Sequence, residues 1–384
     1  MVHDIATGPL RGLRVVELAA LGPGPFAAML LADLGAEVIR VDRPYDSGSG
    51  AIPPEIDATR RGRISVVLDL RRPEGARALL DVVAGSDVLI EGNRPGVTER
   101  LGIGPEDCWR RNPRLIYARM TGWGQDGPLA SSAGHDLGYL ALTGALHAMG
   151  RQGERPPVPL NLVGDYGGGA LYLAVGILAA VFEAARSGRG QVIDAAIVDG
   201  AASLTTVFHA MMAADMWRDE RGVNLLDSGV PWYDVYETAD GRHMAVGAIE
   251  PKFYTEFMSI LGLTPEEHRR EDSAQWPALR SEIAAVISTR TRDEWAKIFE
   301  GTDACVAPVL SLLEAPQHPH LASRGTFVDV GGLTQPAPAP RFSRSVTSVP
   351  QAPPKPGAHT RDALRRCGLD DVDALIRSGI AVQA

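Results

Sequence analysis

Short apolar runs alternate with amphipathic segments over residues 13–120, and no other feature of the sequence constrains the fold as strongly. The first run, 13–18, is followed by a Gly-Pro turn, a helical pattern over 26–34 and a second run at 37–41. Two such strands flanking a helix form a βαβ unit, whose crossover makes the strands parallel. The alternation continues with expected strands at 64–70, 87–91 and 115–120 and a helix at 74–83. We therefore expect an α/β fold whose large domain is Rossmann-like, with a largely parallel sheet.

The pattern changes beyond Asp165, where the longest apolar run of the chain predicts a buried helix. This run, 170–182, is too short to span a bilayer, so we expect no membrane partner. A strand at 191–197 follows, and then a helix that carries Met211, Met212 and Met216. These methionines could line a flexible apolar ligand path or fill the core beneath Trp217, and the sequence leaves both open.

A smaller α+β domain is indicated by a hairpin signal in which Asp240-Gly241 separates β-rich runs at 232–238 and 242–248. Further elements are expected as helices at 253–261 and 276–288, a strand at 326–330, an extended proline-rich segment at 336–356 and a last helix at 371–378. The expected domains are a large one over 1–200 completed by 326–384, a linker helix over 201–225 and a small domain over 226–325.

Composition narrows the partners and the compartment. The 384 residues carry a formal net charge of −9, which disfavours a nucleic acid partner and leaves any anionic ligand to a local group of arginines. Cys108, Cys305 and Cys367 fit neither a disulfide framework nor a metal-binding spacing, so we expect no metal site. With no secretory signal pattern at the N-terminus, we expect a cytoplasmic protein.

A glycine pattern, Gly22-x-Gly24-x-x-Ala27, formally matches a dinucleotide-binding fingerprint, with Asp42 at the end of the next strand. Pro23 and Pro25 remove N–H groups that would hold a pyrophosphate. We therefore expect no nicotinamide cofactor here.

Four arginines follow predicted strands at the edge where ligands of open α/β sheets bind. Arg43, Arg71, Arg94 and Arg100 could together hold phosphates. The alternative is that each is solvated or paired with a neighbour such as Asp42, Asp69 or Glu99.

Three motifs supply candidate acids and bases. His135-Asp136 lies at an expected helix start, where free backbone N–H groups favour negative charge and His135 could act as a neutral base. Asp165 precedes a glycine run that allows a ligand to approach, or it serves as a helix cap. Glu250 follows an apolar strand and either caps a helix or orients a histidine.

These residues lie in motifs that resemble the α-methylacyl-CoA racemases, a branch of CoA-transferase family III (the CaiB/BaiF type). The resemblance runs nearly end to end. It is carried by GLRVVEL at 12–18, RPGVTERLG at 94–102, YARMTGWGQ at 117–125, GHD at 134–136, NLVGD at 161–165 and AVGAIEP at 245–251.

The resemblance implies an interlocked homodimer and an acyl-CoA substrate, with no cofactor beyond the substrate's own CoA. It makes His135 and Asp165 the acid/base pair that moves a proton between the two faces of the carbon next to the thioester, through an enolate. Asp136 belongs to the same group, and Glu250 supports the histidine from the small domain of a partner subunit. The implied CoA contacts are Arg43, Leu68, Asp69, Leu70, Arg71, Gly92, Asn93, Arg94, Arg100, Gly134, Leu137, Gly138 and Tyr139. Gly138 is a departure, because related racemases carry Asn there.

The nearest alternative is a family III CoA-transferase, in which an aspartate at the position of Asp165 attacks the thioester. His135 and Glu250 favour the racemase, because a nucleophilic aspartate needs no opposing base.

Overall fold

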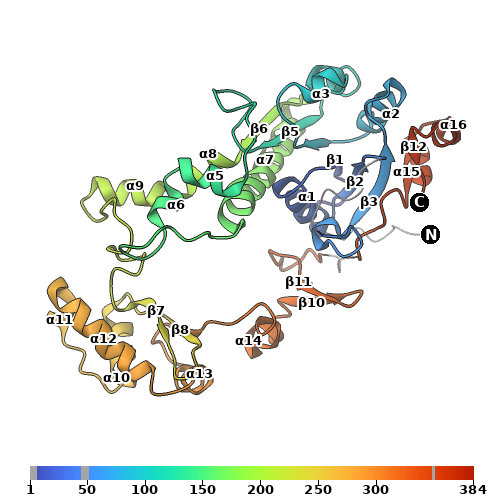
Figure 1. The fold of residues 1–384 in the computed structure, drawn as a ribbon. Coiled ribbons are helices and arrows are strands. Elements are labelled where there is room, and N and C mark those ends of the chain that lie inside the picture. Colours follow the sequence, from blue (N-terminus) through green and yellow to red (C-terminus); the bar gives the residue numbers. More distant parts are fainter. Residues whose placement is uncertain (1–6, 45–51, 348–350) are drawn as a thin grey trace. The chain divides into compact units, whose positions relative to one another are not determined.

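The computed structural model describes residues 7–44, 52–347 and 351–384, which form two compact units. The first unit comprises the chain up to Thr143 together with Pro159–Leu204 and Ser323–Ala384. The second comprises Gly144–Val158 and Thr205–Ala322. Each unit has its own hydrophobic core and is described here by itself (Figure 1).

A seven-stranded sheet forms the centre of the first unit. Its strand order is β12-β3-β2-β1-β4-β5-β6, and all neighbours are parallel except β12, which is antiparallel to β3. The strands are β1 (Arg14–Leu18), β2 (Glu37–Asp42), β3 (Arg63–Leu68), β4 (Val88–Glu91), β5 (Ile116–Thr121), β6 (Val192–Ala196) and β12 (Ala381–Val382). Because the valines and isoleucines of β1 to β5 are buried, these strands match the continuous apolar runs expected for a parallel sheet. The expected α/β class and Rossmann-like sheet are confirmed.

Helices cover both faces of this sheet (Figure 1). One face packs against α2 (Pro73–Ala84), α4 (Pro105–Trp109), α15 (Thr360–Arg366) and α16 (Val372–Arg377), and the other against α1 (Pro23–Asp33) and α7 (Leu171–Ser187). The remaining elements of the unit are η1 (Ala58–Arg60), α3 (Val97–Arg100), α5 (Asp136–Leu142), η2 (Leu162–Ala170), α8 (Ile197–Leu204) and the ribbon of β10 (Phe327–Val330) with β11 (Leu333–Pro336). The strand expected at 326–330 is thus present as β10. The extended segment expected over 336–356 includes 348–350, which lie outside the described residues.

The expected helix after Asp165 is present as α7, and the π-helical turns of η2 run directly into it. Together they give 26 residues, Leu162–Ser187, with a mean hydropathy of 1.8, which is enough by length and composition to cross a membrane. The apolar run 170–182 is itself too short for that, but the continuous helix that contains it is not. Core helices of soluble proteins pass the same test, and here Leu173 and Ile177 are fully buried on the sheet. Each such burial stabilises the fold by roughly 1.5–3 kcal/mol.

The second unit is an antiparallel three-stranded sheet covered by helices. The order is β7-β8-β9, and the expected hairpin is present as β7 (Tyr233–Glu237) and β8 (His243–Gly247), with β9 (Val306–Pro308) beside β8. The helices are α6 (Ala145–Ala148), α9 (Thr206–Ala213), α10 (Pro251–Ile260), α11 (Glu267–Glu271), η3 (Ser273–Gln275), α12 (Trp276–Ile287), α13 (Arg292–Phe299) and η4 (Ala315–Gln317), while α14 (Pro319–Ser323) ends at the boundary between the units.

The unit boundaries differ from the expected domains in two places. Residues 144–158 group with the second unit, where Arg151 forms an ion pair with Asp234 of β7 at 2.6 Å. Over 201–225 there is no single linker helix, because α8 ends at Leu204 and α9 spans only Thr206–Ala213. The loop that follows is closed by Asp227, whose carboxylate accepts backbone N–H groups of Gly222, Asn224 and Gly229.

Candidate active site

Two cavities lie along the carboxyl edge of the parallel sheet in the first unit. The first, of about 400 Å³, is lined by both His135 and Asp165, and we call it the His–Asp cavity. Its walls are the loops after β1, β4 and β5 and the loop that precedes α5. The second, of about 430 Å³, is lined by Arg43 and Arg71 after β2 and β3, and we call it the arginine cavity. Asn93 lines both cavities, and this edge is where open α/β sheets bind ligands.

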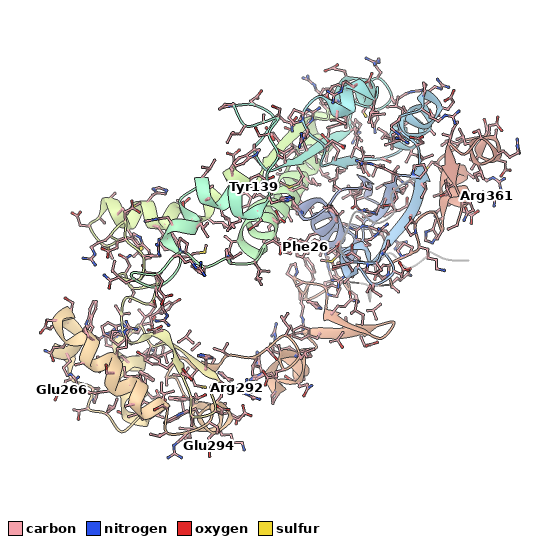
Figure 2. The ribbon with its side chains drawn as sticks, in the orientation of Figure 1. Phe26, Tyr139, Glu266, Arg292, Glu294 and Arg361 are labelled. Carbon is pink, nitrogen blue, oxygen red and sulfur yellow. The ribbon has the colours of Figure 1, made fainter. Side chains whose placement is uncertain are left out.

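His135 occupies the N-cap position of α5, as expected from the sequence, and its side chain is exposed. The loop that carries it packs on the ring of Tyr139 (labelled in Figure 2), which makes an edge contact with Trp123 at 4.7 Å between ring centroids. A Cβ at Gly122 would overlap the Tyr139 ring, and one at Gly134 would lie 2.5 Å from it. Glycine at both positions therefore lets the tyrosine ring hold the histidine loop in place.

Asp165 lies in the π-helix η2 rather than at the helix cap that the sequence left open. Asn161 Nδ2 donates to Asp165 Oδ2 at 3.3 Å. Burial raises the pKa of Asp165 above its usual value, and the nearby Asp136 carboxylate raises this pKa further, while Asn161 and His135 oppose the shift. π-Helical turns occur often at functional sites, and here they carry the carboxyl group into the His–Asp cavity.

Asp136 connects the two catalytic candidates. It follows His135 directly in the chain, and its Oδ1 accepts the backbone N–H of Asp165 at 2.6 Å. Gly164 permits this contact, because a Cβ there would overlap Asp136 Oδ1. Burial raises the pKa of Asp136, and the N–H groups of Asp165 and Gly164 counteract that effect. Asp136 does not line the cavity, so its part in the site is to hold the two segments together.

The first glycine of the pattern at the start of α1 lies against the candidate acid. Gly22 has a φ of 69°, and a Cβ there would lie 3.1 Å from Asp165 Oδ2, so glycine leaves room for the carboxyl group. Asp42, which a dinucleotide ribose would require, is buried and paired with Arg40 at 3.0 Å and Arg60 at 2.8 Å. Sequence reasoning missed this use of Gly22, since a glycine turn does not tell which side chain approaches it.

Three of the four arginines expected to hold phosphates, Arg43, Arg71 and Arg94, divide between the two cavities. In the arginine cavity, Arg71 pairs with Asp69 at 3.1 Å, and this contact lowers the pKa of Asp69. Arg43 Nη2 donates to Asn93 Oδ1 at 3.4 Å, and Arg94 lines the His–Asp cavity. Asp42 pairs with Arg40 and Arg60 instead of Arg43, and Arg119 rather than Arg100 pairs with Glu99.

Several expected site residues lie elsewhere. Leu68 is fully buried in β3, and neither cavity is lined by Arg100, Leu137 or Gly138. Glu250 belongs to the second unit, where it is the N-cap residue of α10. The other expected CoA contacts, Asp69, Leu70, Gly92, Asn93, Gly134 and Tyr139, line one or both cavities. Within the described ranges, no group of three or more His, Cys, Asp or Glu side chains could hold a metal ion.

Comparison with known proteins identifies the family to which this site belongs. The model of CoA-transferase family III matches residues 10–360, which include both cavities. The chain belongs to CoA-transferase family III. The family and its fold were expected from the sequence motifs, and this expectation is confirmed.

Named relatives within CoA-transferase family III cover almost the whole chain. The α-methylacyl-CoA racemase of Mus musculus is 47% identical over 370 residues, which are 95% of each chain. The α-methylacyl-CoA racemase of Homo sapiens is 46% identical over 367 residues, or 94% of each. Among solved structures, a CaiB/BaiF family protein from Brucella suis superposes with a TM-score of 0.81 at 25% identity, covering 94% of this chain and 100% of that one.

Proposed function

We propose that the chain is an α-methylacyl-CoA racemase, which interconverts the (2R) and (2S) forms of 2-methylacyl-CoA thioesters. The observation that carries the proposal is the single cavity lined by both His135 and Asp165. Inversion requires a proton to leave one face of a carbon and another to arrive on the opposite face, so two acid/base groups must share one cavity. The racemase relatives, at 46% and 47% identity, support the same assignment.

The chemistry follows from the acidity of a carbon next to a thioester. In one direction, neutral His135 removes the C2 proton, and the charge passes to the thioester oxygen as an enolate. The protonated carboxyl group of Asp165 then delivers a proton to the opposite face of C2. His135 is left protonated and Asp165 ionised, and this pair catalyses the reverse direction without further change.

The environment of Asp165 suits this exchange. Burial and the nearby Asp136 raise the pKa of its carboxyl group, which increases the fraction that carries a proton at a given pH. Asp165 and His135 exchange the roles of acid and base between the two directions. When the pKa values of two such groups are close, neither direction carries a large energetic cost of proton transfer. The raised pKa thus supports Asp165 as the acid that faces His135.

The substrate's CoA moiety accounts for the second cavity. CoA carries phosphates, and Arg43 and Arg71 place two guanidinium groups on the wall of the arginine cavity. Asn93 borders both cavities, so a CoA held by its phosphates there could pass the thioester to the His–Asp cavity. In this proposal no cofactor is needed beyond the CoA of the substrate.

The interlocked homodimer stays part of the proposal, and an apolar stripe on α7 supports it. Leu171, Val175 and Phe182 are 48%, 65% and 67% exposed, and their spacing puts them on one side of the helix, opposite the buried Leu173 and Ile177. Such a stripe typically marks a surface that packs against another chain. In the dimer, Glu250 of one subunit would orient His135 of the other. Light scattering should give a dimer for the wild type and a monomer for Val175→Glu.

The decisive test is proton exchange coupled to inversion. Incubation of a single-epimer 2-methylacyl-CoA with the protein in heavy water should yield both epimers, with deuterium at C2 of the inverted product. Product that inverts without gaining deuterium, or no inversion at all, would contradict the two-base scheme.

The competing CoA-transferase reaction predicts a covalent intermediate at Asp165. Hydroxylamine and mass spectrometry during turnover, with a free carboxylate offered as acceptor, should detect neither a modified Asp165 nor a new thioester. A covalent adduct on Asp165 would show instead that the protein is a CoA-transferase that uses Asp165 as its nucleophile.

A further inference from the structure

The loop after β4 carries three of the expected CoA contacts, Gly92, Asn93 and Arg94, and a buried carboxylate lies directly beneath it. Glu91, the last residue of β4, is only 3% exposed. A carboxylate in this position is costly to keep away from water unless it is paired, so its partners indicate why the chain retains it.

Glu91 holds the backbone of Asn93. Its Oε2 accepts the backbone N–H of Asn93 at 2.7 Å. The Asn93 side chain in turn accepts, through Oδ1, a hydrogen bond from Arg43 Nη2 at 3.4 Å. The carboxylate below therefore fixes the backbone from which the Asn93 amide reaches Arg43.

Arg119 fixes Glu91 from the neighbouring strand. The two residues are register partners on β4 and β5, and Arg119 Nε lies 3.6 Å from Glu91 Oε1. The other guanidinium nitrogens are engaged by Gln125, at 2.7 Å from Nη1, and by Glu99. With its far side held in this way, the Arg119 side chain presents a fixed positive charge to Glu91.

We propose that Glu91, held by Arg119, is a positioning residue that sets Asn93 and Arg43 for CoA binding at the junction of the two cavities. This inference rests on the proposed acyl-CoA chemistry. Glu91 lines neither cavity, so it acts through Asn93 and takes no part in proton transfer.

Three variants test the role of Glu91. Glu91→Ala removes the acceptor, whereas Glu91→Gln keeps an oxygen that can accept the Asn93 N–H. Glu91→Met removes the acceptor at similar volume and serves the same purpose if the alanine variant does not fold. Glu99→Gln is the matched control, because its amide oxygen can still accept the hydrogen bond from Arg119 Nη2 and so keep that side chain in place, while Glu99 makes no hydrogen bond to Asn93.

Affinity for free CoA, measured by titration calorimetry, and the KM and kcat for 2-methylacyl-CoA are the readouts. Glu91→Ala and Glu91→Met each lose the hydrogen bond that the charged carboxylate accepts from Asn93. This loss should raise both Kd and KM about tenfold and leave kcat within about twofold of the wild type. Glu91→Gln should stay within about threefold of the wild type, and Glu99→Gln should match it. Unchanged Kd and KM in the acceptor-free variants, or a fall in kcat alone, would overturn the inference.

The same measurements separate this inference from the proposed function. If the wild type binds CoA but does not racemise the thioester, the proposed function fails while the Kd ratios still test Glu91. If the wild type racemises and the acceptor-free variants bind CoA as well as it does, the positioning role alone fails.

Discussion

The carboxylate of Asp136 accepts the backbone N–H of Asp165 at 2.6 Å, so the residue next to the candidate base also holds the segment of the candidate acid. Without this contact, His135 and Asp165 would depend on separate loops for their spacing. A hydrogen bond from a backbone N–H to an ionised carboxylate is stronger than one between two neutral groups. The spacing between His135 and Asp165 is therefore set by contacts within the first unit alone.

The pH dependence of the reaction should respond to Asp136. The acid/base pair is active with one proton, so the acid limb of kcat/KM reports the lower of the two apparent pKa values of the pair, to which Asp165 contributes. Burial first, and then the Asp136 charge, raise the pKa of Asp165. Asp136→Asn removes the charge but keeps an oxygen for the N–H, so the limb should move to lower pH. A limb that stays in place or moves to higher pH in the measured profile would show that Asp136 does not act on this titration.

Removal of either member of the pair should abolish most of the racemisation. His135→Ala and Asp165→Ala should each lower kcat by ~10²–10⁴-fold, since each removes a general acid/base. Both side chains lie at the cavity surface, so melting temperature and CoA affinity should stay close to those of the wild type. Near-normal turnover by the Asp165 variant would refute the two-base scheme.

The methionines of the α9 region can be tested by acyl chain length. Met211 and Met212 are half-buried on α9, while Met216 is exposed. Met216 therefore does not fill the core beneath Trp217. Met212→Gln should weaken long-chain substrates more than short ones, because burial of a methylene group contributes about 0.8 kcal/mol and only a long tail would lose apolar contacts at this position. Steady-state KM across a chain-length series, with a thermal melt as control, is the measurement. An equal loss at all lengths together with a lower melting temperature would place Met212 in the core.

Acid stability of the second unit should depend on Glu314. Arg292 of α13 (labelled in Figure 2) binds both carboxylate oxygens of Glu314, at 2.8 and 3.0 Å, and its hydrogen bonds lower the pKa of Glu314 from 4.5 to about 2. Because the pKa of Glu314 is lower in the folded state than in the unfolded state, its ionised carboxylate stabilises the fold at pH values above the unfolded pKa. This stabilisation is lost as the pH falls toward about 2.

Glu314→Gln should therefore lower the melting temperature at neutral pH, and its difference from the wild type should shrink as pH falls from 4.5 to about 2. Glu300→Gln is the control, because among the described residues Glu300 forms no ion pair. A difference that is constant over this pH range would mean that the charge of Glu314 does not stabilise the unit.

The sheet could be predicted from the sequence because its strands are apolar on both faces and are separated by glycine and proline turns. The position of His135 at a helix start followed from a turn before an apolar run. The proximity of His135 and Asp165 did not follow from any local pattern and entered through the resemblance alone. Residues 144–158 were assigned to the large domain because long-range pairs such as Arg151 with Asp234 leave no local signal.

Glu91 also escaped the sequence analysis, for a related reason. A charged residue at the end of an apolar strand usually reads as the first solvated position of a loop. Its burial comes from the neighbouring Arg119, which is distant in the chain. The available signal was the pair of opposite charges in two consecutive parallel strands, Glu91 at the end of β4 and Arg119 within β5.

The direction in which the Asp165 side chain points depends on the number of residues per turn in η2. Residues in a π-helix advance around the axis by a smaller angle than those in an α-helix, so the direction of Asp165 relative to α7 depends on how many residues adopt that winding. Deletion of one residue between Asp165 and Ala170 would let the segment rewind, rotating the carboxyl group away from its partner while Leu173 and Ile177 keep their places on the sheet. The ability to invert C2 thus depends on the number of residues in the π-helical turns, which insertions and deletions alter and point substitutions leave untouched.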